Sequence, residues 1–90
     1  MPDSYAVVFS SAARRQMAAL PEKIATAAIE FIFGDVAENP HRVGSSLRGP
    51  LHDKHRATRG TYRIIYVIHE DDAEVEIQDI VLRADAYRRR

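Results

Sequence analysis

The sequence predicts an α+β domain with the element order βααβββ, in which a helical hairpin packs on a small, mostly antiparallel sheet. Two observations carry this prediction. A short apolar segment near the N-terminus is followed by two consecutive helical patterns. Three strand-like segments then follow residue 53, separated by turn dipeptides. The 90 residues give room for one domain, to which we assign residues 1–90.

The first half of the chain contains the strand and both helices. Tyr5–Phe9 is short, apolar and rich in β-formers, which is typical of a strand. Ser10 or Ser11 then offers an N-cap for a helix of about ten residues. Pro21 suits the first position of a second helix, where its missing N–H costs nothing. The Asn39-Pro40 pair ends this helical pattern.

The second half begins with a predicted loop over residues 41–53, which is rich in Gly, Ser and Pro. Three strands are expected after it, at Lys54–Thr58, Thr61–His69 and Ala73–Arg83, with hairpin turns at Arg59-Gly60 and at Asp71-Asp72. The Thr61–His69 segment is apolar on both faces, so we expect it to be a central strand of the sheet.

Composition excludes several classes of protein. With 46% apolar and 29% charged residues, the chain is typical of a folded globular protein. It has no cysteine, which excludes disulfides and thiolate metal sites. No apolar run approaches the roughly 20 residues that span a bilayer, and the first four residues lack the basic region of a signal peptide. We therefore expect a cytoplasmic protein without a membrane partner.

Charge is segregated along the chain although the net charge is +0. Residues 42–63 hold six basic groups against Asp53 alone, residues 64–82 hold six acidic groups and no basic one, and residues 83–90 hold four arginines against Asp85. Such patterning can maintain a local positive field on a neutral protein, suited to nucleic-acid phosphates. Alternatively, these charges form only a solvated surface.

The first hairpin brings several of these cations together. If Arg59-Gly60 is a two-residue turn, Arg56 lies opposite Arg63 and Lys54 lies opposite Ile65. Lys54, Arg56 and Arg63 then project from the same face of the sheet. Like charges placed directly opposite each other destabilise a hairpin, which favours a bound anion at this position. Alternatively, the cations extend into water or pair with the acidic segment.

The remaining polar residues give weaker signals. The spacing of His41, His52, His55 and His69 matches no metal-binding motif, so we expect neither a metal site nor a cofactor. His52 or His55 offers a base beside the cations, although a loop histidine is more often simply solvated. Tyr87 lies among arginines, which suits stacking on an unpaired base, or alternatively it pins the C-terminus to the sheet.

Three stretches of the chain resemble the RelE/ParE superfamily of bacterial toxins. They are Leu-Arg-Gly at 47–49, Arg-Gly-Thr-Tyr-Arg-Ile-Ile-Tyr at 59–66 and Arg-Ala-Asp-Ala-Tyr-Arg at 83–88. Leu-Pro-Glu-Lys at 20–23 and Phe-Gly-Asp at 33–35 are similar to RelE toxins of actinobacterial type. The resemblance covers essentially the whole chain. It implies the βααβββ fold, an antitoxin encoded nearby as partner, and cleavage of messenger RNA on the ribosome.

The resemblance also implies roles for individual residues. It matches Lys54 and Arg56 to two basic strand positions that are both lysine in well-studied relatives, so Arg56 is a departure. Leu82 is another, because many relatives have a basic residue there. The implied catalytic residues are Lys54, Arg56, Arg63, Arg83 and Tyr87. RNA contacts are predicted at Arg48, which matches a position that holds messenger RNA, and at Arg59 and Arg88.

Without a metal-ligand set in the sequence, the expected chemistry uses the RNA's own 2′-hydroxyl as nucleophile and leaves a 2′,3′-cyclic phosphate. Arginines would stabilise the charge of the phosphorane by bidentate hydrogen bonds. Lys54 is the preferred general base, with Arg56 and Arg63 nearby favouring its neutral amine. Tyr87 would align the attack by stacking, with less direct proton transfer.

Two further functions remain open. The first is a ParE-like inhibitor that binds DNA gyrase and performs no chemistry. Such proteins share the fold but generally lack the basic strand pair and the terminal tyrosine, so Lys54, Arg56 and Tyr87 favour the nuclease. The second is a non-catalytic RNA-binding module.

Overall fold

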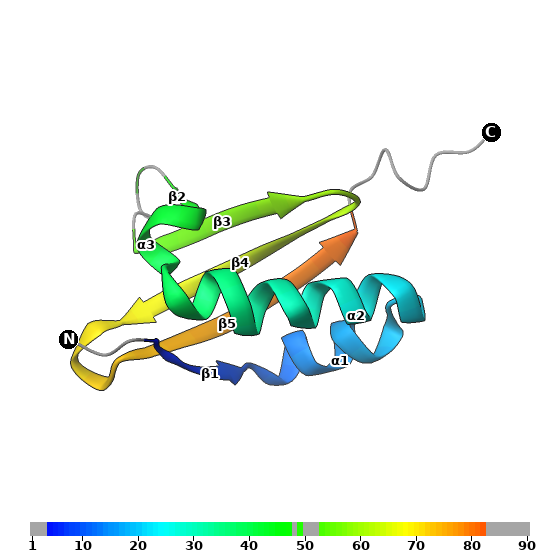
Figure 1. The fold of residues 1–90 in the computed structure, drawn as a ribbon, viewed down its shortest axis with the longest axis horizontal. Coiled ribbons are helices and arrows are strands. Elements are labelled where there is room, and N and C mark those ends of the chain that lie inside the picture. Colours follow the sequence, from blue (N-terminus) through cyan, green and yellow to red (C-terminus); the bar gives the residue numbers. More distant parts are fainter. Residues whose placement is uncertain (1–3, 48, 50–52, 83–90) are drawn as a thin grey trace.

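The computed structural model describes residues 4–47, 49 and 53–82, which form a five-stranded sheet with helices on one face (Figure 1). The strand order is β1-β5-β4-β3-β2, in which β1 runs parallel to β5 and every other neighbour is antiparallel. The strands are β1 Ala6–Phe9, β2 Ser45–Ser46, β3 Lys54–Arg59, β4 Tyr62–His69 and β5 Glu74–Leu82. The predicted α+β class is confirmed, and β4 lies inside the sheet as expected.

Two helices form the predicted hairpin. α1 spans Ser11–Ala19. Its N-cap is Ser10, whose hydroxyl accepts a hydrogen bond from the Ala13 amide at 3.0 Å. α2 spans Glu22–Phe31, so Pro21 precedes the helix instead of occupying its first position. The Ser10 hydroxyl also donates to the Gln78 carbonyl of β5, which ties the start of α1 to the sheet.

Residues 32–46 contain elements that the sequence did not predict. α2 continues into a π-helical turn at Ile32–Val36, and both of these end residues are buried. A short helix α3 then covers Pro40–Val43, because a proline that ends one helix can also open the next. β2 pairs with β3. The predicted loop over 41–53 is therefore wrong where α3 and β2 lie.

The register of the first hairpin corrects another prediction. The turn is Gly60-Thr61, with Gly60 at a φ of +59°, so Arg59 lies opposite Tyr62. Arg56 therefore lies opposite Ile65, and Arg63 lies opposite Thr58, so the predicted opposition of Arg56 and Arg63 is wrong. Glycine takes the turn position that needs positive φ, and the two guanidinium groups avoid direct opposition. Moving the turn by one residue shifts each cross-strand partner by two residues, so every side chain stays on the sheet face that was predicted for it.

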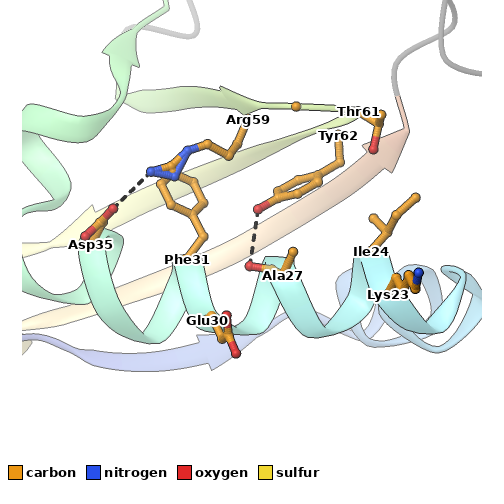
Figure 2. A pocket seen from close by; sticks show the side chains of 10 residues that line it. Lys23, Ile24, Ala27, Glu30, Phe31, Asp35, Arg59, Thr61 and Tyr62 are labelled. Carbon is orange, nitrogen blue, oxygen red and sulfur yellow. Dashed lines mark hydrogen bonds and ion pairs between the residues drawn. The ribbon is translucent and has the colours of Figure 1, made fainter.

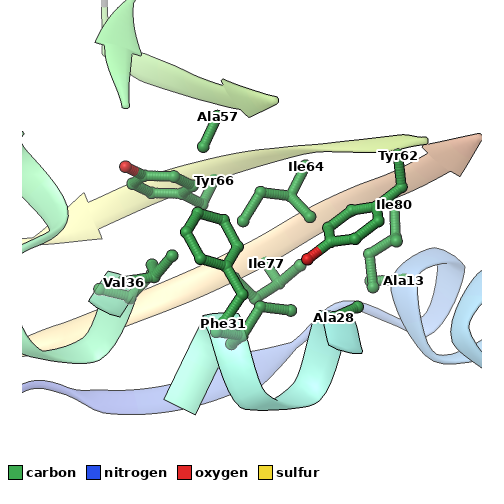
Figure 3. Close-up of a cluster of buried hydrophobic side chains, with 12 residues drawn as sticks. Ala13, Ala28, Phe31, Val36, Ala57, Tyr62, Ile64, Tyr66, Ile77 and Ile80 are labelled. Carbon is green, nitrogen blue, oxygen red and sulfur yellow. The ribbon is translucent and has the colours of Figure 1, made fainter. Parts of the chain in front are cut away.

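The core lies between the sheet and the helices (Figure 3). Ile64 and Tyr66 of β4 point into it together with Val75 and Ile77 of β5, and all four are fully buried. The hydroxyl of Tyr66 donates to the Pro40 carbonyl at 2.7 Å, so burying this ring leaves its polar end satisfied. Among the helices of the described segments, none is long and apolar enough to cross a membrane.

Candidate nucleic-acid interface

The face of the sheet opposite α1 and α2 carries the predicted basic residues. Lys54, Arg56 and Arg63 lie on this open face, as expected from alternation along the strands. Arg56 and Arg63 are exposed, and Lys54 is half-buried. Arg56 lies two residues beyond Lys54 on β3, and Arg63 is diagonal to Arg56 on β4. The three residues therefore form a row of roughly 13 Å along the hairpin, which we call the cationic row.

Lys54, at one end of this row, is held from β5. Its ammonium group donates a hydrogen bond to the side-chain oxygen of Gln78. Ile65 pairs with Asp79 while Tyr66 pairs with Ile77, so Gln78 is the extra residue of a bulge. Such a bulge re-aims one side chain of a strand, and here it brings the amide of Gln78 to Lys54.

The acidic residues of the same face gather at the end of the sheet where Lys54 lies, since Lys54 and Glu76 both pair with Val67. Glu74 and Glu76 lie on β5 beside His69 and Val67, away from the hairpin turn. His69 bonds to Glu76 at 3.1 Å, and this hydrogen bond raises the pKa of the imidazole. No ion pair among the described residues joins the cationic row to a carboxylate. The alternative in which the cations pair with the acidic segment is therefore disfavoured.

Arg59 lies on the other face of the hairpin, apart from the cationic row. Its guanidinium group contacts Asp35 at 3.1 Å and lies 4.3 Å from the centre of the Phe31 ring (Figure 2). These three residues line one part of a groove of about 540 Å³ between α2 and the hairpin turn. Arg59 is directed toward the helical layer, so the structure does not bring it together with Lys54, Arg56 and Arg63.

The rest of the predicted site lies outside the described residues. Arg48, Arg83, Tyr87 and Arg88 belong to this group, as does His52. The last described residue of β5, Leu82, pairs with Tyr62 beside the hairpin turn. β5 therefore ends at the same end of the sheet as Arg63.

A histidine cluster lies behind β3 and was missed at the sequence level. His55 faces the helical layer, where it stacks on Tyr66 with ring centres 5.5 Å apart and lies 6.0 Å from His41. Its Nδ1 is buried and has no hydrogen-bond partner among the described residues. Burial lowers the pKa of His55, and the nearby His41 lowers it further. His55 therefore points away from the cationic row and does not offer a base beside these cations. Alternation along β3 indicates this, because His55 lies between Lys54 and Arg56.

His41 belongs to a polar cluster at the surface beside His55. Its imidazole pairs with Glu70, which also accepts a hydrogen bond from the Tyr5 hydroxyl at 3.2 Å. The hydrogen bond from His41 lowers the pKa of Glu70. Within the described segments, no three His, Asp or Glu side chains gather in a way that could hold a metal ion.

The fold occurs in small bacterial toxins of known sequence and structure. The family of ParE toxins of type II toxin-antitoxin systems matches residues 7–87, and the chain belongs to this family. It is 45% identical to Toxin RelE of Mycobacterium tuberculosis over 84 residues, which is 93% of this chain and 87% of the relative. It is also 45% identical to Toxin RelG of the same organism over 85 residues, covering 94% and 98% of the two chains.

Solved structures agree with this assignment. The toxin-antitoxin complex RelBE2 from Mycobacterium tuberculosis matches with a TM-score of 0.86 and 41% identity, covering 89% of this chain and 99% of that chain. The isolated Escherichia coli RelE toxin matches with a TM-score of 0.76 and 18% identity, covering 88% and 84%. The second similarity extends to the fold alone.

Proposed function

We propose that this toxin is a metal-independent endoribonuclease that cleaves messenger RNA on the ribosome. The observation that carries the proposal is the cationic row on the open face of the sheet, which forms no ion pair with a carboxylate among the described residues. An array of cations held by strand backbones suits phosphates, because the charges need little reorganisation when RNA binds. The resemblance to RelE toxins implies the same activity.

The proposed reaction is an internal transesterification. A base removes the proton of a ribose 2′-hydroxyl, whose oxygen attacks the adjacent phosphorus. The bond from phosphorus to the 5′-oxygen then breaks, and an acid protonates that oxygen. The products are a 2′,3′-cyclic phosphate and a new 5′-hydroxyl, and no oxidant or water is consumed. The protein must therefore stabilise the phosphorane, which gains negative charge, and move two protons.

The residues of the cationic row divide these tasks. Arg63 and Arg56 would stabilise the phosphorane through forked hydrogen bonds. Lys54, in its neutral form, would accept the proton of the 2′-hydroxyl, and its bond to Gln78 holds it in position. Arg56 is a poor base because a guanidinium group keeps its proton. Arg83 and Tyr87 remain proposed members of the site, with Tyr87 aligning the attacked nucleotide by stacking.

A binding-only inhibitor of DNA gyrase is the second candidate. The description of the matching family as ParE toxins favours it. The pair of strand cations at Lys54 and Arg56 favours the nuclease, because ParE-like toxins generally lack it. A non-catalytic RNA-binding module would share the cationic row but would leave the RNA intact.

We further propose that an antitoxin encoded nearby neutralises this chain in the cytoplasm. The matching complexes of RelE toxins with RelB antitoxins support such a pairing. The antitoxin is expected to bring carboxylates to the cationic row and so displace RNA. Expression without it should arrest growth, and coexpression of the antitoxin should restore growth. Normal growth despite abundant folded protein would contradict a toxin.

Mapping of RNA ends in a translating extract separates the candidates. With purified protein added, the nuclease should produce cuts in phase with codons, and only while ribosomes translate. A gyrase inhibitor should leave messenger RNA intact and abolish supercoiling in a reaction with purified gyrase. An RNA-binding module should do neither, so intact RNA and unimpaired gyrase would contradict both toxin mechanisms.

A further inference from the structure

An irregularity in β5 lies behind the contact between Lys54 and Gln78. The register of β4 against β5 shifts between Ile65 and Tyr66, which leaves Gln78 outside the ladder of paired residues. A bulge of this kind bends its strand and re-aims a side chain. We call Gln78 and the residue after it, Asp79, the β5 bulge.

Side chains of α1 and its N-cap hold the β5 bulge in place. The Ser10 hydroxyl donates to the Gln78 carbonyl at 3.0 Å. The side-chain oxygen of Gln16 accepts from the Ile80 amide at 2.8 Å, and the Gln16 amide nitrogen donates to the Asp79 carboxylate at 3.2 Å. A bulge interrupts the hydrogen bonds between strands, and these side chains satisfy backbone groups around it. The direction in which Gln78 points is therefore fixed from the helical layer.

The partner of Lys54 is a neutral amide, although a carboxylate lies at the same level of the sheet. Lys54 and Glu76 pair with Val67 from opposite sides. Glu76 instead bonds to His69 at 3.1 Å. The half-buried Lys54 donates its hydrogen bond to the side-chain oxygen of Gln78. Lys54 is thus held without an ion pair to any described residue.

A neutral acceptor suits a lysine that must lose a proton. A carboxylate in the same place would favour the charged ammonium group and so oppose its deprotonation. An amide oxygen can accept a hydrogen bond from the ammonium group and from the neutral amine, because both carry N–H groups. Such an acceptor fixes the position of the nitrogen in both protonation states.

We propose that Gln78 is a positioning residue, which the β5 bulge presents to Lys54 so that the amine is held on the open face while remaining free to take up and release a proton. This inference rests on the proposed nuclease function, in which Lys54 is the general base. Gln78 acts only through Lys54 and touches none of the reacting atoms. Its effect on cleavage should therefore depend on the presence of Lys54.

Single-turnover cleavage of messenger RNA on programmed ribosomes, measured from about pH 6 to about pH 9, tests this role. Gln78→Met replaces the amide by a thioether, which is a weak acceptor, so the rate should fall about ten- to hundredfold across the range. Gln78→Glu keeps the acceptor but adds a charge, so its rate should approach the wild-type rate only at higher pH. Ribosome affinity should stay at the wild-type value in both variants, because the loss lies in proton transfer.

Asp79→Asn is the matched control within the same bulge. Asp79 bonds to Gln16 of α1 and not to Lys54, and asparagine keeps the oxygen that accepts this bond. The cleavage rate should change by less than about twofold, with an unaltered pH profile. Thermal unfolding should show that every variant is folded. A loss in Asp79→Asn as large as that in Gln78→Met would assign the effect to the bulge backbone and overturn the role of the Gln78 amide.

A double-mutant cycle shows whether Gln78 acts through Lys54. Lys54→Met should lower the rate strongly by itself. Adding Gln78→Met to it should lower the rate by less than about threefold more, because no amine remains to be positioned. Losses that multiply in the double variant would overturn the proposal.

Nuclear magnetic resonance of the free toxin keeps this proposal distinct from the nuclease. The chain contains two lysines, Lys23 and Lys54, and Lys23 is exposed on α2. The ammonium protons of Lys54 should exchange with water more slowly than those of Lys23, and Gln78→Met should abolish this difference. A held Lys54 in a wild type that cuts no messenger RNA would overturn the nuclease and leave the positioning standing. Equally fast exchange at both lysines of the wild type, or wild-type cleavage by Gln78→Met at every pH, would overturn the positioning role.

Discussion

His55 combines burial with a group that titrates near neutral pH. Its neutral ring fits between Tyr66 and His41, and its Nδ1 has no hydrogen-bond partner among the described residues. Protonation would place a charge against buried surface and next to His41, which is why the pKa lies below its ordinary value of 6.5. Glu70, which pairs with His41, brings a carboxylate to the same cluster.

This lowered pKa predicts a loss of stability in acid. The unfolded chain binds a proton at His55 more readily than the folded chain does, so the free energy of unfolding should fall as the pH drops below about 6.5. The effect of His69 on stability has the opposite dependence on pH. Its raised pKa provides stability below about 6.5 that is lost as the pH rises through the folded value.

Chemical denaturation between pH 5 and 7 checks both signs. His55→Phe retains an aromatic ring against Tyr66, so its stability relative to wild type should increase toward pH 5. The stability of His69→Gln relative to wild type should instead decrease as the pH falls from 7 to 5, because only wild type gains the stabilising proton at His69. Parallel pH profiles for wild type and His55→Phe would show that His55 does not titrate as inferred.

Two core tyrosines differ in how well their hydroxyl groups are satisfied. Tyr66 donates to the Pro40 carbonyl at 2.7 Å, and burial raises its pKa to about 12. Tyr62 donates to the Ala27 carbonyl at 3.4 Å, which is long for an O–H donor. Tyr66→Phe should therefore cost about 1–3 kcal/mol of unfolding free energy, and Tyr62→Phe less than about 1 kcal/mol. Urea denaturation of the two variants tests this order, and equal losses would contradict it.

At the scale of elements, the segment that joins α3 to β2 packs closely against the sheet. Gly44 joins them and lies directly against Tyr66 and β3. A Cβ atom on Gly44 would clash with the Tyr66 hydroxyl and would lie 3.0 Å from the Arg56 carbonyl. The Tyr66 hydroxyl is itself held by Pro40, so this contact cannot relax cheaply.

A pair of glycine substitutions tests that packing. Gly44→Ala should destabilise the protein by about 1–3 kcal/mol through overpacking. Gly34 lies in the π-helical turn, with no atom within 4 Å of an added Cβ. Gly34→Ala should instead stabilise by about 0.5–1 kcal/mol, because alanine loses less backbone freedom on folding. Thermal unfolding of both variants measures the difference, and a neutral Gly44→Ala would contradict the close packing.

Local patterns predicted most elements but not how they meet. The helix start at Ser10 and the three long strands follow from capping and from alternation, which act within a few residues. The π-helical turn at Ile32–Val36 has no signal in the sequence, because Ile32 and Val36 are four residues apart and would share the core face in an ordinary α-helix as well. The hairpin register depends on whether Gly60 takes the first or the second position of the two-residue turn, and the Arg59-Gly60-Thr61 stretch allows both.

At the scale of the whole molecule, parity along each strand decides which face of the sheet a side chain occupies. Strand alternation was enough to predict that Lys54, Arg56 and Arg63 share a face, because the face depends only on parity along each strand. The same parity places Arg59, which pairs with Tyr62, on the helical side of the sheet.

Replacement of Arg63 tests the central claim, that the cationic row performs RNA cleavage. Arg63 is exposed on an interior strand, opposite Thr58 and Val81, so Arg63→Ala should leave the fold intact. It removes charge stabilisation of the transition state worth roughly 3–4 kcal/mol. Arg63→Lys should also lose most of the activity, because an ammonium group cannot make the forked contact. Arg15→Ala, an exposed arginine of α1, is the matched control.

The deciding measurement is the rate of messenger RNA cleavage on programmed ribosomes, under single-turnover conditions with the toxin bound. We predict that Arg63→Ala lowers this rate by about two to three decades while Arg15→Ala retains the wild-type rate. A folded Arg63→Ala toxin that binds ribosomes and cuts messenger RNA at the wild-type rate would contradict the claim and place the active site elsewhere.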